Sequence, residues 1–159
     1  MAEDTLVDFA VVAYRDEGQW QVAALPPRAA TDMNAFVHAL RQQQSDGISI
    51  GLCSYGDDFF LAVRLHGEDV RVLVSDSTAV GEWPIAMQAL EVMGEPEPED
   101  DTVEPVGDLG IFADLGVGPM EVAAICSDLE LYPDEMLGQI AAQIGFGPQF
   151  EQAVDPDQA

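Results

Sequence analysis

The chain has 159 residues, 48% of them hydrophobic, which is enough to bury the core of one compact domain with or without a small appendage. Its 30 acidic residues stand against five arginines and no lysine, for a formal net charge of -25. A protein that binds phosphates needs Lys and Arg to displace counterions, so direct binding of nucleic acid or of an anionic membrane is not expected. A basic protein surface is the natural partner; the alternative is that the charge only keeps the protein soluble.

Neither export nor membrane insertion is expected from the sequence. No apolar run approaches the roughly 20 residues that span a bilayer. The first ten residues, MAEDTLVDFA, have acids where a signal peptide carries positive charge. The cytoplasm is therefore the expected location. Cys53 and Cys126 lie far apart and are expected to be small buried residues rather than a disulfide.

Five β-strands are predicted, at residues 8–14, 20–24, 48–53, 59–65 and 70–75. Each is rich in β-branched or aromatic residues, or alternates apolar and polar residues, as strands do. The first two form a hairpin, with Gly18 available for a positive φ in the turn. The last three are joined by short turn-like segments, so they are expected to form an antiparallel meander.

Two helices are predicted among these strands. The first has Thr31 or Asp32 as its N-cap and an apolar stripe at helical spacing over residues 33–40. The second begins at Pro84, a favoured first-turn residue, and ends at Gly94.

The resulting order, ββ-α-βββ-α, predicts an α+β domain over residues 1–94, with a five-stranded antiparallel sheet and helices on one face. This order is similar to that of the longin, roadblock and profilin-like folds, which mostly serve in protein interaction. Residues 95–106 hold acids and prolines without an apolar period and are predicted to be an extended linker. Residues 107–155 are predicted to be a helical segment that packs on itself or on the sheet domain.

Within this segment, one helix is predicted to start at Pro119 and another at Pro133, followed by a short turn around Phe150. Asp134 and Glu135 then fall in a first helical turn, where the helix dipole favours acids. Asp128 and Glu130 close the preceding helix. They are expected to be solvated or to face an arginine or a partner.

No catalytic, cofactor-binding or metal-binding residue is predicted. The two histidines and two cysteines are scattered, and no C-x-x-C pair exists for zinc. The chain has no nucleophile elbow, no P-loop and no G-x-G-x-x-G segment after a strand. The acidic linker lacks the pattern of a calcium loop. The protein is therefore expected not to be an enzyme and to need no cofactor.

Two arginines form the most specific candidate site. A tight turn over residues 66–69 would pair Leu65 with Val70. The same register places Arg64 opposite Arg71, and like charges directly opposite are destabilising. All five arginines precede residue 72, whereas the chain from Glu95 onward has 16 acids and no base. We therefore expect acids of the C-terminal half, or of a partner, to offset the pair. The candidate partner-binding or internal ion-pair site consists of Arg64, Arg71, Asp128 and Glu130.

Three stretches together resemble one family. They are DFAVVAYR (8–15) leading to ALPPR (24–28); DDFF (57–60) and LVSD (73–76) with WP (83–84); and GDLGIFADLG (107–116) through LYPDEML (131–137). The order and the amino-acid sequences of these stretches resemble those of the actinobacterial tRNA adenosine deaminase-associated proteins. The resemblance implies a partner or regulator of a tRNA adenosine deaminase and supplies no catalytic residue.

The chain does not look like the deaminase itself. Zinc deaminases use a His-x-Glu segment and a Pro-Cys-x-x-Cys segment. Here Ala39 and Leu40 follow His38, and Cys126 is followed by Ser127 and Asp128. Two alternatives stay open beside a partner role. One is a small-molecule-binding domain with a pocket between the sheet and the C-terminal helices, and the other is a self-associating domain that forms a homodimer.

Overall fold

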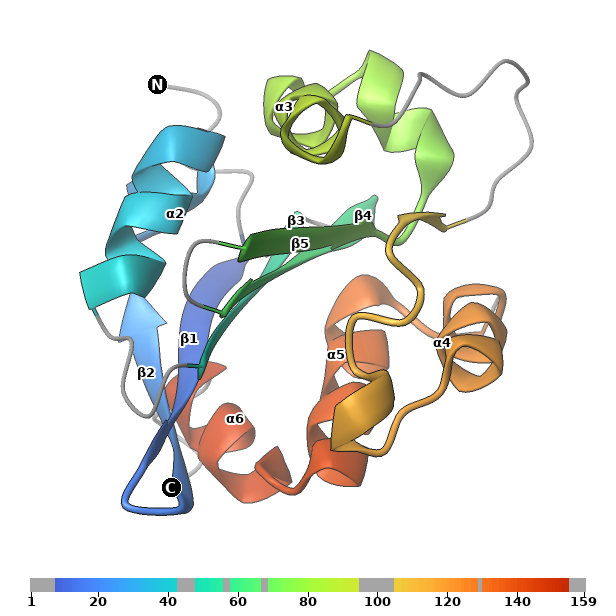
Figure 1. Ribbon diagram of the computed structural model, residues 1–159. Helices are drawn as coiled ribbons and strands as arrows, with labels where there is room; N and C mark the ends of the chain where they lie inside the picture. The colour runs from blue at the N-terminus through green and yellow to red at the C-terminus, as the bar shows by residue number, and fades with distance from the viewer. Residues whose placement is uncertain are drawn as a thin grey trace.

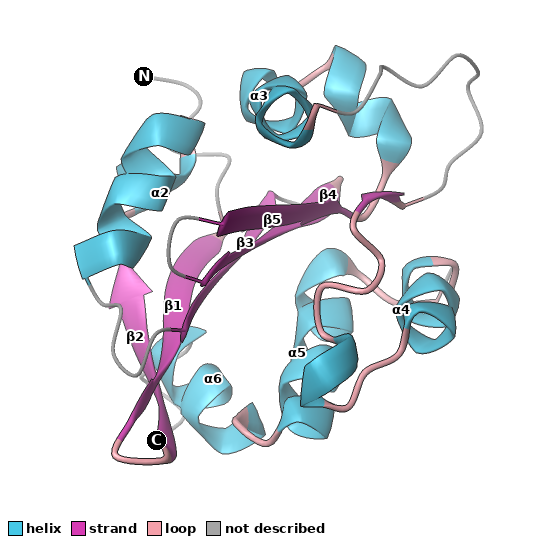
Figure 2. Cartoon of the chain, viewed as in Figure 1, coloured by secondary structure: helices cyan, strands magenta, loops and turns pink. Residues whose placement is uncertain are grey.

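The computed structural model describes residues 8–42, 48–55, 58–66, 69–94, 105–128 and 130–154. It is an α+β structure in which one antiparallel sheet lies between two layers of helices (Figures 1 and 2). The strands are β1 (Phe9–Asp16), β2 (Gln19–Leu25), β3 (Ile48–Tyr55), β4 (Phe59–His66), β5 (Asp69–Val74) and β6 (Val106–Gly107). The helices are α2 (Met33–Gln42), α3 (Pro84–Met93), α4 (Pro119–Cys126), α5 (Pro133–Ile144) and α6 (Gly147–Val154). Short 3-10 helices are η1 (Pro27–Ala30), η2 (Ser77–Gly81) and η3 (Ala113–Leu115).

The sheet has six strands in the order β2-β1-β3-β4-β5-β6, and each neighbouring pair is antiparallel. The predicted hairpin and meander are confirmed. The turn between β1 and β2 consists of Glu17 and Gly18, both with positive φ, as a type I′ turn requires.

The predicted number of five strands is wrong, because β6 adds a sixth. It pairs with β5 through Val106, opposite Val74, and Gly107, opposite Leu73. Gly107 has φ +111°, and a Cβ there would collide with the carbonyl oxygen of Val72, so the close approach requires glycine. A two-residue strand at the end of an acidic stretch has no apolar alternation that would reveal it in the sequence.

The sheet carries a hydrophobic core on each face. On the first face, strand residues such as Val12, Leu61 and Val63 pack with Phe36 and Leu40 of α2 and with α3. The residues of the second core, which packs against α4, α5 and α6, include Val11, Ile50, Leu52, Phe60, Leu73, Val122, Leu137, Ile140 and Phe150. Both faces are covered, since β3 is buried along its whole length and β4 along all but its last residue.

The two helices predicted within residues 1–94 do lie on one face of the sheet, but the sheet is not open on the other. The C-terminal helices cover the second face, and the structure has three layers (Figure 1). The predicted turn around Phe150 is instead the eight-residue helix α6, whose buried residue is Phe150.

The helix ends follow the predicted signals. Pro84, Pro119 and Pro133 stand at the first turns of α3, α4 and α5. Asp32 caps α2, because its Oδ2 accepts the N–H of Ala35 at 3.0 Å.

The predicted linker lies largely outside the described residues, which resume at Pro105. Its last predicted residue, Val106, belongs to the sheet. The division into a sheet domain, a linker and a helical segment stays a prediction.

Candidate partner-binding surface

Two arginines face each other on the second face of the sheet. The predicted register is confirmed: Leu65 pairs with Val70, and Arg64 pairs with Arg71. Both side chains point to the side of the C-terminal helices, since they alternate with residues of the first core. Two like charges in adjacent strands need compensation from this layer.

Arg64 is held by the segment that follows β6. Its side chain is 7% exposed, and its two terminal nitrogens donate to the two carboxylate oxygens of Asp114 at 2.5 and 2.8 Å. Nη1 also donates to the carbonyl oxygen of Ile111 at 2.8 Å. Such a bidentate pair is among the stronger polar contacts in proteins. The hydrogen bonds from Arg64 lower the pKa of Asp114 below its ordinary value of 3.8.

Arg71 makes the second contact to the same segment. Its Nε donates to Oδ2 of Asp108 at 2.5 Å, and its Nη2 donates to the carbonyl oxygen of Gly110 at 2.9 Å. The other oxygen of Asp108 accepts the N–H of Gly110 at 2.9 Å, which fixes the turn. Residues 108–114 thus lie over the arginine pair and supply one carboxylate to each arginine.

The other two predicted site residues lie elsewhere. Asp128 and Glu130 are exposed in the connection from α4 to α5, and Oδ1 of Asp128 accepts the N–H of Glu130 at 3.0 Å. Within the described residues, neither carboxylate is paired with Arg64 or Arg71. Their membership of a partner-binding site stays a prediction.

Sequence reasoning did not single out Asp108 and Asp114 as the acids opposite the arginines. Both lie in the stretch GDLGIFADLG (107–116), one of the three that carry the family resemblance. They are also the first acids after the predicted linker. Their position just after the predicted linker was the one feature of the sequence that could have suggested these two acids. The sequence does not reveal that the chain returns there to the edge of the sheet beside β5.

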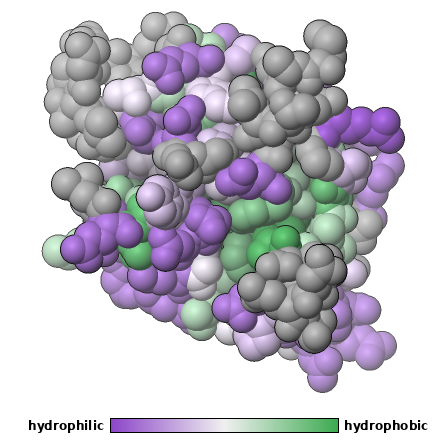
Figure 3. Space-filling view, turned by 180° about the vertical axis from the view of Figure 1, so that it is seen from behind, coloured by the Kyte–Doolittle hydropathy of each residue, from purple (hydrophilic) through white to green (hydrophobic). Residues whose placement is uncertain are grey.

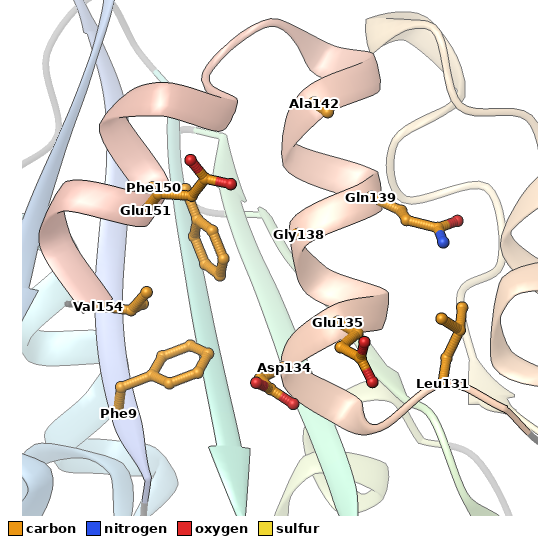
Figure 4. Close-up of a pocket in the computed structure, with 10 residues that line it drawn as sticks. All are labelled: Phe9, Leu131, Asp134, Glu135, Gly138, Gln139, Ala142, Phe150, Glu151 and Val154. Atoms are coloured by element: carbon orange, nitrogen blue, oxygen red, sulfur yellow. The ribbon is translucent and has the colours of Figure 1, made fainter. Parts of the chain in front are cut away.

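A groove of about 590 Å³ is lined by residues of α5, α6, the connection before α5 and the start of β1. Its apolar lining includes Phe9 at the start of β1, Leu131, Phe150 and Val154. Figure 4 shows the rings of Phe9 and Phe150 reaching toward α5 from β1 and from α6. The two rings contact edge to face, with centroids 5.6 Å apart.

Three carboxylates border this apolar lining. Asp134 and Glu135 stand in the first turn of α5, and Glu151 projects from α6 (Figure 4). Glu135 accepts the N–H of Tyr132 at 3.1 Å and so helps to cap α5. Asp134 and Glu151 have no side-chain hydrogen bond or ion pair within the described part of the chain. None of the described residues that line the groove is basic.

The face turned away from the viewer in Figure 1 also exposes apolar residues. Figure 3 shows an apolar area on this face, set among hydrophilic residues. A mixed surface of this kind suits contact with another macromolecule.

Two properties of the described residues bear on nucleophilic and metal-dependent chemistry. Burial raises the pKa of the Cys53 thiol to about 12 and that of the Cys126 thiol to about 12, so neither is a ready nucleophile near neutral pH. In the described ranges, no three His, Cys, Asp or Glu side chains are grouped so that they could hold a metal ion. None of the helices found there is long and apolar enough to cross a membrane.

Fold and site together define a small acidic α+β protein whose sheet is covered on both faces and whose C-terminal layer exposes six acids and no base among its described residues. The chain belongs to the family of Rv3753c-like tRNA adenosine deaminase-associated proteins, whose model matches residues 8–147. It is 36% identical to Protein Rv3753c of Mycobacterium tuberculosis over 158 residues, which cover 97% of this chain and 91% of that protein. No solved structure matches the chain significantly.

Proposed function

We propose that the protein is a non-enzymatic acidic interaction protein that binds a tRNA adenosine deaminase in the cytoplasm, as its partner or regulator. The deaminase is proposed as the partner because the family is described as tRNA adenosine deaminase-associated. The observation that carries the proposal is the surplus of unpaired acids on the C-terminal layer. An enzyme that binds tRNA needs a basic surface, and an acidic protein complements such a surface.

Internal ion pairs use only two of the acids in this layer, so the others are available to a partner. Between residues 105 and 154 the chain has eight acids and no base. Asp108 and Asp114 are used by the two arginines of the sheet. The remaining six are all exposed, namely Glu121, Asp128, Glu130, Asp134, Glu135 and Glu151. We include Asp128 and Glu130 in the proposed contact surface because no arginine of the chain neutralises them.

The test is binding of the purified deaminase, measured by calorimetry at low and at moderate salt. We expect binding that weakens as salt rises, because contacts between exposed charges are screened. The double variant Asp128→Asn/Glu130→Gln should weaken binding. A matched double variant at two exposed acids near α3, Glu82→Gln/Glu91→Gln, should bind like the wild type. Absence of binding at low salt would contradict the proposal.

A second measurement tests regulation. Deamination of tRNA by the enzyme is followed with and without this protein, because an acidic partner that covers the basic surface competes with tRNA for it. Light scattering on the protein alone tests the alternative of a homodimer. The likeness to longin and roadblock interaction modules stays a prediction from the order of the elements.

A further inference from the structure

We propose that the groove over α5 and α6 is the docking site for a basic amphipathic helix of a protein partner. The inference rests on the proposed function for the identity of the partner, but not for the chemistry of the groove. Its occupant must present apolar side chains to the lining and Lys or Arg side chains to the bordering carboxylates.

The charge of the groove selects the occupant. Asp134 and Glu151 stand on opposite sides of the apolar lining, one on α5 and one on α6, and neither is paired within the described residues (Figure 4). A second copy of this chain, with a net charge of -25, would be repelled. The segments of the chain next to the described ends, residues 1–7 and 155–159, carry acids and no base, so they do not complement these carboxylates.

Gly138, which lines the groove, is a second and independent feature that favours a docking site. Gly138 lies in the middle of α5, where glycine is less favourable than any residue except proline. Its φ is not positive, and a Cβ built on it would meet nothing within 4 Å. Neither its backbone conformation nor packing within the described residues therefore requires glycine. What the absence of a side chain provides is room for another molecule to approach α5 closely from outside.

The elements around the groove favour a helical occupant. An extended peptide is usually bound by adding a strand to an exposed sheet edge. The groove is lined by α5, α6, the connection before α5 and Phe9, and β1 is an inner strand already paired with β2 and β3. Recognition must therefore come from side chains, as when the apolar face of a helix lies in a groove. Gly138 and Ala142, one turn apart on α5, carry nothing larger than a methyl group in this lining, so they would not obstruct such a helix (Figure 4).

The experiment uses the full chain and a synthetic amphipathic helix of leucine and lysine with a fluorescent label. Two control peptides have glutamate in place of lysine, or the same composition in scrambled order. Anisotropy is expected to show binding of the first peptide alone. Gly138→Leu fills the groove without changing the charge and should weaken binding at least tenfold, on the order of the loss expected at the centre of an interface.

Two further variants separate the effect of side-chain size from the effect of charge in the groove. Gly138→Ala, the matched control, should fold more stably and bind nearly as well as the wild type. Asp134→Asn/Glu151→Gln should weaken binding about threefold to tenfold and reduce its salt dependence. Equal binding of the peptide to the wild type and to both Gly138→Leu and Asp134→Asn/Glu151→Gln would overturn the inference, as would equal binding of the scrambled peptide.

The same variants separate this inference from the proposed function. If the deaminase binds the wild type and both groove variants equally, the groove assignment is wrong and the proposed function stands. If the leucine–lysine helix binds the wild type but not Gly138→Leu, while the deaminase binds neither, the proposed function is wrong and the groove assignment stands.

Discussion

The two faces of the sheet are covered in different ways. The first face is covered by α2 and α3, which follow β2 and β5 in the chain. Its described buried polar contacts join neutral groups. Ser49 Oγ donates to the carbonyl of Leu40 at 3.0 Å, and the Tyr55 hydroxyl donates to the carbonyl of Ala30 at 2.6 Å. The second face is covered by the C-terminal half and includes the arginine pair with its two carboxylates.

The difference between the two faces lies in their dependence on charge. Apolar packing on the first face does not depend on salt or on pH near neutrality. On the second face, two opposed arginines make the docking of residues 108–114 depend on charge. The helices and connections that follow this segment expose six further acids that neither Arg64 nor Arg71 neutralises. Both faces therefore carry an apolar core, and only the second also includes a charged contact between the sheet and its covering layer.

The largest expected effect tests the apolar face. Phe36 is fully buried against the sheet, and Phe36→Ala should lower the free energy of unfolding by about 3–5 kcal/mol, because it leaves a large cavity. Urea unfolding at two salt concentrations measures it. The loss should be the same at both. A loss that changes strongly with salt would mean that charge also holds the first face.

A smaller effect is expected from the arginine pair, and it should be unequal. Arg64→Ala should cost about 1–3 kcal/mol, because it removes a buried bidentate contact and leaves the carbonyl of Ile111 without its donor. Arg71 is 38% exposed, so Arg71→Ala should cost less than about 1 kcal/mol. Urea unfolding of the two variants side by side measures the difference. Equal losses would show that burial does not distinguish the two arginines.

The smallest effect is a pH dependence. The pKa of Asp114 is lowered in the folded protein, so its contribution to stability is present above its unfolded pKa and is lost as the pH falls through the lower folded value. Relative to Asp114→Asn, the wild type should be more stable at pH 7, and the difference should shrink below about pH 4. Unfolding midpoints across this range measure it, and a difference that does not change with pH would exclude this linkage.

Local patterns in the sequence predicted much of the frame. Alternating apolar residues located five strands, and prolines and Gly94 marked helix ends. The short turn before Asp69 gave the register that sets Arg64 opposite Arg71. These features depend on neighbours in the chain, so a single sequence contains their physical causes.

The missed features depend on residues that are distant in the chain. The strand β6 consists of two residues and exists only because the chain returns to β5. Which carboxylates meet the arginines follows from that return. The groove brings Phe9 against Phe150, from the first and last described elements. The sequence does not set Gly138 apart from other helical glycines, because the open space beside it depends on how distant segments pack.

The late position of β6 has a consequence for synthesis on the ribosome. When residues 1–94 have emerged, the segments that form β1 to β5, α2 and α3 have been made, but the helices that cover the second face have not. The second face, with Leu52, Phe60 and Leu73, is then an apolar surface in contact with water, and Arg64 has no carboxylate beside it. Such a nascent chain is prone to aggregate or to be held by a chaperone. The acidic stretch 95–104 is made next, so a run of negative charge follows the uncovered strands in the chain before the covering helices are synthesised.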